Sequence, residues 1–280
     1  MKIKPIVKRL IRLVVPEKIV RDVRVDKVAI LCGEVLVGKT VLITGGSVGL
    51  GFAMARKFID EGAYVIITGR NEDRLNAAVA KLESPRVRYI VWDVTDVRGV
   101  EGYVLKLQEL APNGVDVLIN NAGVANREKF GALTDENWNR VFETNLKGLV
   151  FITQAIVNCW LKTSKSGVVL NIVSFAAFEH NEDAYSLSKS ALVALTRGLG
   201  RKYAGHGIRV NAIAPGVIVG TEVNPIQRSI DPSGNLSCDW IPVGRYGVPE
   251  EIAELATFLI SDASAYVFGQ TIVADGAASL

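Results

Sequence analysis

The stretch Thr44–Gly51 reads Thr-Gly-Gly-Ser-Val-Gly-Leu-Gly and stands between an apolar run, Thr40–Thr44, and a segment of helical period, Leu50–Glu61. Glycines let the backbone turn sharply and approach a ligand, because they carry no side chain. The start of the following helix offers unpaired N–H groups and a partial positive charge, which favour phosphate. A glycine-rich turn in this position predicts a dinucleotide site rather than a purely structural turn.

Beyond this turn, short β-branched runs alternate with longer segments of helical period. Strands are predicted at Thr40–Thr44, Ala63–Thr68, Val87–Val91, Val115–Ile119, Val168–Val173, Ile208–Ile213 and Gln270–Val273. Helices are predicted at Leu50–Glu61, Glu72–Leu82, Val97–Leu110, Glu136–Lys162, Asp183–Ala204 and Pro249–Ser261. Most strands are continuously apolar, which indicates burial on both faces. The pattern predicts one doubly wound α/β domain with a seven-stranded parallel sheet covered by helices.

Composition fits a folded chain with a sizeable core. The 280 residues are 49% apolar and 22% charged, with a mean hydropathy of +0.26, so disorder is excluded as the dominant state. The longest uncharged stretch, Thr40–Ala55, is shorter than the about 20 residues of a membrane-spanning helix, so we expect no transmembrane segment. The net charge of +3 is too small to indicate nucleic acid as a partner.

The cysteines and histidines carry little functional signal. Cys32, Cys159 and Cys238 share no CxxC spacing, and their odd number without a secretory leader favours a reducing, cytoplasmic compartment. No metal-ligand spacing surrounds His180 or His206, so no metal site is predicted.

The basic character is concentrated at the N-terminus, where residues 1–30 hold nine basic and three acidic residues. Apolar residues at Ile3, Val7, Leu10 and Val14 suit a short amphipathic helix that Pro16 would stop. Such a segment can lie on an anionic membrane as a peripheral contact. It can also be an extension that packs on its own or a neighbouring subunit, which we favour because acidic residues dilute the charge. We therefore divide the chain into a basic arm, residues 1–36, and a domain, residues 37–280.

Further motifs follow the other predicted strands in a fixed order. They are Asp93-Val94, Asn120-Asn121-Ala122-Gly123, Asn145 within a helix, Ser174, Tyr185-Ser186-Leu187-Ser188-Lys189 and Pro215-Gly216. Together with TGxxxGxG in the first turn, this series resembles the short-chain dehydrogenase/reductase family over residues 37 to 276. The resemblance implies a Rossmann-type fold and an NAD(P)-dependent oxidoreductase that interconverts a ketone or aldehyde and an alcohol.

Tyr185 and Lys189 are four residues apart and therefore share one face of a helix. Reduction of a carbonyl needs a hydride from the cofactor and a proton from the protein, for which Tyr185 is the candidate. Lowering a phenol pKa from near 10 to about 7 requires roughly 4 kcal/mol. One cation supplies about 1–3 pKa units, so Lys189 needs help, for which the oxidised nicotinamide ring is a candidate.

The resemblance adds two further catalytic roles. It implies that Lys189 also holds the nicotinamide ribose and that Asn145 joins it, through an ordered water, to a proton relay. The Ser174 hydroxyl can donate a hydrogen bond to the substrate oxygen, where negative charge grows as the hydride arrives. The interval between Ser174 and Tyr185 is slightly shorter than is usual in the family, which affects the expected shape of the substrate pocket.

The end of the second strand bears on the choice of cofactor. An acidic residue there favours the free ribose hydroxyl of NAD, whereas a nearby Arg accommodates the phosphate of NADP. Here Gly69 is followed by Arg70, which favours NADP. Two features leave NAD open: Arg70 can be a solvated residue at a helix start, and Val48 stands where many NADP-preferring relatives have a basic residue. The predicted cofactor-binding residues are Thr44, Gly45, Ser47, Gly49, Leu50, Gly51, Arg70, Asp93, Val94, Asn121, Ala122, Gly123, Tyr185, Lys189, Pro215, Gly216 and Thr221.

Residues Val217–Tyr246 have little regular periodicity and are predicted to form a lid over the substrate. Phe175, Phe178 and Trp240 either line an apolar pocket or belong to the core. The predicted helices Glu136–Lys162 and Asp183–Ala204 are apolar over much of their circumference. The family resemblance implies that they pack against a partner subunit, in a homodimer or homotetramer.

Three functions stay open on these grounds. The leading one is an NADP(H)-dependent reductase or dehydrogenase acting on a small-molecule carbonyl or alcohol. A 3-oxoacyl-acyl-carrier-protein reductase is the alternative among enzymes, and it predicts a basic docking patch beside the active-site mouth. An NAD(P)-sensing binding protein without catalysis is the alternative of another class. The complete set of Asn145, Ser174, Tyr185 and Lys189 argues against it.

Overall fold

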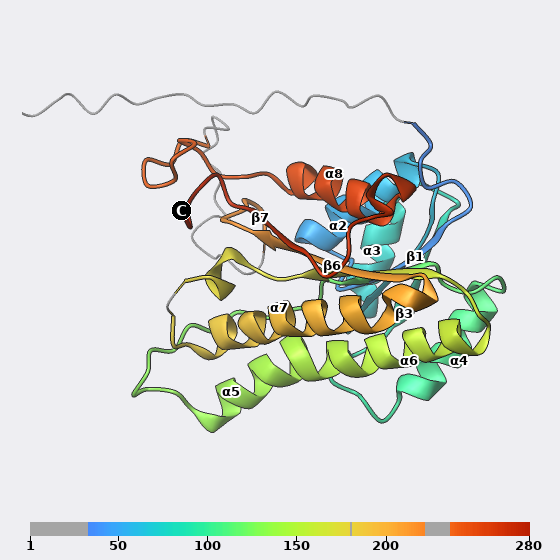
Figure 1. Cartoon of the computed structure of the whole chain (residues 1–280), viewed down its shortest axis with the longest axis horizontal. Helices are drawn as coiled ribbons and strands as arrows, with labels where there is room; N and C mark the ends of the chain where they lie inside the picture. Colours follow the sequence, from blue (N-terminus) through green and yellow to red (C-terminus); the bar gives the residue numbers. More distant parts are fainter. Residues whose placement is uncertain (1–32, 180, 222–235) are drawn as a thin grey trace, which may run out of the picture.

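The centre of the fold is one parallel sheet with the strand order β3-β2-β1-β4-β5-β6-β7 (Figure 1). The computed structural model describes residues 33–179, 181–221 and 236–280. The strands are β1 (Thr40–Thr44), β2 (Tyr64–Gly69), β3 (Val87–Val91), β4 (Val117–Asn120), β5 (Gly167–Ile172), β6 (Ile208–Pro215) and β7 (Thr271–Ala274). The predicted seven-stranded parallel sheet is confirmed, with a shift of one or two residues at several strand ends.

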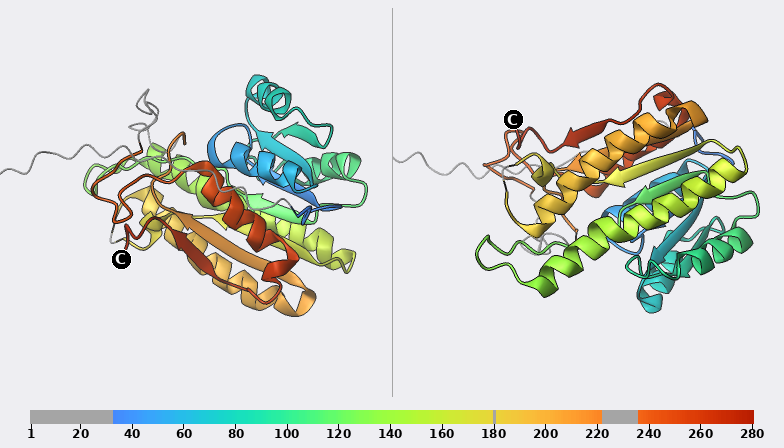
Figure 2. Two further views of the ribbon diagram at one scale, coloured as in Figure 1. Left: turned by 90° about the horizontal axis from the view of Figure 1, so that it is seen from above. Right: turned by 60° about the horizontal axis from the view of Figure 1, so that its bottom comes forward.

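Helices cover both faces of this sheet, as Figures 1 and 2 show. One layer contains α2 (Gly49–Asp60), α3 (Glu72–Leu82) and α8 (Pro249–Ile260), and its core includes Phe58, Leu75 and Leu259. The other layer contains α4 (Val100–Leu110), α5 (Asp135–Phe142), α6 (Gly148–Lys162) and α7 (Ala184–Tyr203). Its core includes Trp92, Leu107 and Ile156. Short 3-10 turns occupy Phe175–Ala177, Ala204–His206 and Asp262–Ser264.

The strand order reverses direction between β1 and β4, which are hydrogen-bonded neighbours in register at Ile43 and Ile119. The chain segments that leave these two strands therefore diverge to opposite sides of the sheet. In open α/β sheets, ligands bind in the crevice outside the carboxyl ends of the strands at such a reversal. This geometry places the glycine turn after β1 beside Asn121 after β4.

The helix starts differ in a way that bears on this crevice. Asn71, Thr134 and Asp183 cap α3, α5 and α7, each accepting a hydrogen bond from a backbone N–H of the first turn. α2 begins after Val48 without a side-chain cap. Its first N–H groups are therefore the ones that a ligand can engage.

The predicted single helix Glu136–Lys162 is wrong in one respect. The chain forms α5, then a π-helical turn at Glu143–Lys147, and then α6. A Cβ built on Gly148 would collide with the Val94 carbonyl, so a glycine is required where the chain leaves the π turn. π turns insert an extra residue into a helix and often mark functional positions. Here the turn contains Asn145, which is fully buried.

The predicted helix Val97–Leu110 starts late, at Val100, because the Asp96 carboxylate accepts a hydrogen bond from the Gly99 N–H in a turn before the helix. Several predictions lie outside the described residues: the amphipathic segment Ile3–Val14, Cys32, His180 and the middle of the expected lid, 222–235. Among the helices that the structure describes, none combines the length and the hydropathy needed to cross a bilayer.

Candidate active site

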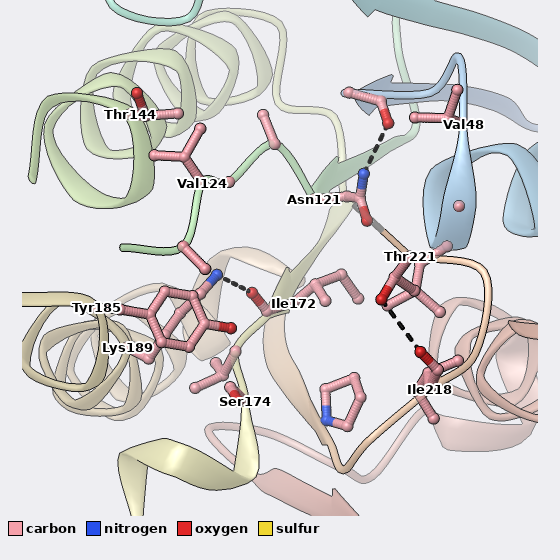
Figure 3. Close-up of a pocket in the computed structure, with 18 of the residues that line it drawn as sticks. Val48, Asn121, Val124, Thr144, Ile172, Ser174, Tyr185, Lys189, Ile218 and Thr221 are labelled. Atoms are coloured by element: carbon pink, nitrogen blue, oxygen red, sulfur yellow. Dashed lines mark hydrogen bonds between the residues drawn. The ribbon is translucent and has the colours of Figure 1, made fainter. Parts of the chain in front are cut away.

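The carboxyl ends of the strands open into a cavity of about 830 Å³. Its walls come from the segments that follow β1 to β6 and from the first turns of α7 (Figure 3). Of the predicted site residues, those that line the cavity are Gly45, Ser47, Gly49, Leu50, Arg70, Asp93, Val94, Asn121, Ala122, Gly123, Ser174, Tyr185, Lys189, Pro215, Gly216 and Thr221. Thr44, Gly51 and Asn145 lie behind the wall.

Buried hydrogen bonds hold the glycine turn against the end of β4. Thr44 is fully buried, and its Oγ1 accepts hydrogen bonds from the backbone N–H of Asn121 at 3.0 Å and of Ala122 at 3.1 Å. The Asn121 side-chain amide donates in return to the carbonyls of Thr44 at 2.9 Å and Gly45 at 2.8 Å. Thr44 and Asn121 therefore fix the path of the turn.

The glycines of the turn fit the close approach of a dinucleotide. Gly45 and Gly49 have φ of +69° and +56°, in the left-handed region that favours glycine. A Cβ on Gly45 would lie 3.0 Å from Ala122 Cα, and a Cβ on Gly51 would collide with the Gly45 carbonyl. The backbone of the turn and the uncapped start of α2 thus form a cradle suited to a pyrophosphate. The residues present fit the cofactor that the family resemblance implies.

Two arginines lie at the end of the cavity that follows β2. Arg70 comes directly after Gly69, the last residue of β2, and Arg74 lies one turn further on in α3. Asp93, which also lines the cavity, accepts hydrogen bonds from the N–H and the hydroxyl of Thr95 at 3.0 and 2.8 Å. The segment Gly69-Arg70-Asn71 at the end of β2 contains no carboxylate, and Arg70 places a guanidinium group at this end of the cavity.

Tyr185, Ser174 and Lys189 meet at the opposite end of the cavity. Asp183 caps α7 through the Ser186 N–H at 2.9 Å, which sets the position of Tyr185 in the first turn of the helix. The phenol of Tyr185 points toward Ser174, which follows β5 (Figure 3), and the Ser174 hydroxyl is close enough to lower the pKa of the phenol. Lys189 Nζ lies 5.8 Å from the centre of the Tyr185 ring and donates to the Ile172 carbonyl at 2.9 Å. All three side chains are buried.

Burial controls the titration of this pair. It lowers the pKa of Lys189 to about 8, because the buried ammonium has lost its hydration. Burial raises the pKa of Tyr185; the Ser174 hydrogen bond and the nearby Arg127 act in the opposite direction, while Asp183 adds to the rise. In the chain alone, burial outweighs the effects of Ser174 and Arg127 on the Tyr185 pKa. The expectation that Lys189 lowers this pKa with help from the oxidised nicotinamide ring stays a prediction.

Asn145 is engaged by backbone and side-chain partners within the wall. Its Oδ1 accepts from the Val124 N–H at 2.8 Å, and its Nδ2 donates to the Val124 carbonyl at 2.9 Å and to Ser188 Oγ at 3.2 Å. Asn145 and Lys189 approach each other at Gly123. A Cβ built there would lie 3.3 Å from Asn145 Oδ1 and 3.5 Å from Lys189 Nζ, so the missing side chain leaves space between these two polar atoms.

Sequence reasoning missed several residues that the structure brings to the site. Arg127, four residues after Gly123, lines the cavity with its guanidinium carbon 5.6 Å from the centre of the Tyr185 ring. Ser188 supports Asn145, although it lies within the quoted Tyr185–Lys189 motif. The sequence could have pointed to Arg127, because it is a basic residue in the loop directly after the Asn-Asn-Ala-Gly motif.

The aromatic residues considered for the substrate pocket divide between two environments. Phe175 and Trp240 line the cavity, whereas Phe178 does not and is half exposed.

In the described ranges, no group of three or more His, Cys, Asp or Glu side chains is arranged to hold a metal ion.

Comparison with known proteins gives the same picture as this geometry. Residues 45–278 match the family model described as enoyl-(acyl carrier protein) reductase. The chain belongs to the short-chain dehydrogenase/reductase family. It is 34% identical over 248 residues to the 3-oxoacyl-(acyl-carrier-protein) reductase FabG of Chlamydia pneumoniae, covering 86% of this chain and 97% of that enzyme.

Two further members of the short-chain dehydrogenase/reductase family illustrate its range. The NAD-dependent glycerol dehydrogenase of Listeria innocua is 35% identical over 240 residues, covering 85% of this chain and 92% of that enzyme. The crystal structure of a short chain dehydrogenase from Bacillus anthracis superposes with a TM-score of 0.77 at 34% identity, covering 86% of this chain and 97% of that one. The chain is therefore an NAD(P)-dependent oxidoreductase with the Rossmann-type fold of this family.

Proposed function

We propose that this protein is an NADP(H)-dependent oxidoreductase that interconverts a ketone or aldehyde and an alcohol, with Tyr185 as the acid and base. The single observation that carries the proposal is the convergence of Tyr185 and Ser174 on one cavity wall, with Lys189 Nζ 5.8 Å from the centre of the tyrosine ring. The dinucleotide, when bound, supplies or accepts the hydride.

The side chains divide the remaining work. In the reducing direction the Tyr185 phenol gives its proton to the carbonyl oxygen, and the Ser174 hydroxyl donates a second hydrogen bond to that oxygen. The Lys189 ammonium, whose pKa is about 8, favours the phenolate that remains. Asn145 and Lys189 flank the space beside Gly123, which suits a water that returns the proton to Tyr185.

The preference for NADP rests on Arg70. Its guanidinium lines the cavity directly after Gly69, and Arg74 adds a second cation nearby. A charge-assisted hydrogen bond between Arg and phosphate contributes about 1.5–3 kcal/mol. Arg70→Ala should therefore weaken NADPH binding by about ten- to a hundred-fold and leave NADH binding unchanged. An unchanged ratio of the two affinities would remove Arg70 from the argument and favour NAD.

Substrate class is tested by a screen of NADPH oxidation over ketones, aldehydes, sugars, steroids and acyl thioesters. We expect turnover with at least one of these carbonyl compounds, and none with Tyr185→Phe. Bound NADPH with no turnover of any carbonyl compound, or of any alcohol with NADP, would instead favour a nucleotide-sensing protein without catalysis.

A 3-oxoacyl-acyl-carrier-protein reductase is the second candidate, and the 34% identity to FabG is consistent with it. The same proton transfer would act on the ketone of a 3-oxoacyl thioester. This candidate predicts that a carrier-linked substrate is reduced with a much lower KM than the same acyl group on a short thiol. Equal KM values would leave the smaller carbonyl compounds as the preferred class.

Assembly and location complete the proposal. Phe151 on α6 and Leu187 on α7 are 42% and 40% exposed, which favours a second subunit on this helix layer and hence a homodimer or homotetramer. Sedimentation at low concentration tests this.

The proposed location is the cytoplasm. Liposome flotation of the full chain and of a chain lacking residues 1–36 tests peripheral membrane contact through the arm.

A further inference from the structure

We propose that Arg127 makes this enzyme selective for substrates that carry an anionic group, a carboxylate or a phosphate, close to the reacting carbonyl. The inference deepens the proposed function and rests on it. Arg127 lies in the loop between β4 and α5 and lines the cavity. Its guanidinium carbon is 5.6 Å from the centre of the Tyr185 ring, so a positive charge stands beside the group that meets the substrate oxygen.

The neighbouring acidic residues leave this charge available. Glu128 is directed to the start of α5, where it accepts hydrogen bonds from the Thr134 N–H at 3.0 Å and from the Asn137 side-chain amide. Within the described ranges, no carboxylate forms an ion pair with Arg127. The guanidinium therefore keeps the hydrogen-bond donors that pair with both oxygens of a carboxylate or phosphate.

The charges of the cavity lining also favour an anion. Among the residues that the structure describes, four cationic side chains line it, namely Arg70, Arg74, Arg127 and Lys189, and two acidic ones, Asp93 and Glu179. Both carboxylates have other partners, since Asp93 bonds to Thr95 and Glu179 accepts from the Asn181 amide at 2.8 Å. Lys189 is buried and donates to Ile172, while Arg70 and Arg74 lie at the end that follows β2. Of these four described cations, Arg127 is thus the one placed for the substrate.

Binding to the complex with oxidised NADP tests this without turnover, because a ketone cannot be reduced there. The probes are pyruvate, acetoacetate and 4-oxopentanoate, each beside its methyl ester, and 2-oxopropyl phosphate beside its dimethyl ester; none of them carries an alcohol group that oxidised NADP could oxidise. Calorimetric titration should show that the native protein binds the charged member of at least one pair about ten- to a hundred-fold more tightly. The pair that shows this difference in affinity identifies the preferred anionic group as a carboxylate or a phosphate.

Two variants assign the preference to one side chain. Arg127→Gln should abolish the difference between the charged and neutral members, while binding of the neutral member stays the same. Lys129→Gln removes the same charge from an exposed position two residues away that does not line the cavity, and it should leave the preference intact.

The proposal is overturned if the native protein binds every pair equally or if Arg127→Gln keeps the native preference. It is also overturned if Arg127→Gln weakens both members of each pair equally, which is the result expected if Arg127 only stacks on Tyr185. Failure of the proposed function is a different result. A charge preference that depends on Arg127, without oxidation of NADPH by any carbonyl compound, would leave the anion site in place and remove the catalysis.

Discussion

The glycine turn after β1 and the start of α7 after β5 face the same cavity but are built in opposite ways. The turn offers backbone groups, and the side chains of buried Thr44 and partly buried Asn121 hold it in place by hydrogen bonds to each other's backbone. The start of α7 offers side chains, and its buried groups Tyr185 and Lys189 have pKa values displaced by loss of hydration. Recognition of the dinucleotide thus depends on backbone shape, whereas proton transfer depends on the burial of titratable groups.

After removal of the Tyr185 hydroxyl, the largest expected effect that separates the two regions is that of Ser174→Ala. Loss of the hydroxyl removes a hydrogen bond to the substrate oxygen and should lower kcat/KM by about 10²–10³-fold, with unchanged NADPH affinity. The pKa of Tyr185 should also rise further, because the Ser174 hydrogen bond lowers it, so the pH profile of kcat should shift upward.

The matched control is Ser190→Ala, since Ser190 lies in α7, outside the cavity lining, and its hydroxyl donates to the Ala177 and Ser186 carbonyls. It should cost about 1 kcal/mol of stability and leave turnover intact. Equal losses of turnover in both variants would mean that Ser174 acts only through the fold.

Lys189→Met probes the titration of the α7 region through stability. The folded-state pKa of Lys189 is about 8, below its ordinary value of 10.5, so the unfolded chain binds more protons between these two values. The stability of the native protein relative to the variant should therefore rise with pH through this window, by about 3 kcal/mol at most. Below pH 8 both states hold the proton, and the native protein bears the full cost of burying the charge.

Chemical unfolding of both proteins at several pH values between about 8 and 10 measures this difference. Tyr185 does not interfere with this measurement. Its pKa is raised in the folded state, so it destabilises the native state only at pH values above this window, where the unfolded chain loses the phenol proton first. If the difference in unfolding free energy between the two proteins stays constant across this pH window, the lowered pKa of the buried Lys189 is contradicted.

Gly51→Ala probes the backbone of the glycine turn, with a smaller expected effect. The added methyl group would collide with the Gly45 carbonyl and crowd the Asn121 amide at 2.7 Å, which should cost about 1–3 kcal/mol of stability and weaken NADPH binding. Gly102→Ala in α4 meets nothing within 4 Å and should not destabilise the protein. Thermal unfolding with and without NADPH distinguishes the two, and equal effects would show that the turn is not constrained as described.

The sequence predicted the sheet, the turn and most of the cavity lining, because these depend on local patterns. Continuous apolar runs specify buried parallel strands, and residues at strand ends such as Ser174 and Gly216 reach one edge whatever the details of packing. The π turn at Asn145 was missed because its sequence has the same helical period as its flanks. Its cause is distant in the chain, where Gly148 packs on the Val94 carbonyl.

The electrostatics of the site were the least predictable part. The spacing of Tyr185 and Lys189 reveals that they share a helix face, but the depth of their burial depends on every element packed around them. Arg127 reaches the Tyr185 ring from a different loop, and no spacing in the sequence states that contact. Local pattern thus predicts which residues are available, and tertiary packing decides how they titrate.

The most direct test of the central claim is the turnover of Tyr185→Phe on a carbonyl substrate of the native enzyme, measured together with its NADPH affinity. The variant keeps the ring under Arg127 and above Lys189 but lacks the proton. We predict a loss of kcat of at least about 10³-fold with NADPH affinity within about two-fold of native. Retained turnover in a variant that binds NADPH normally would contradict the account.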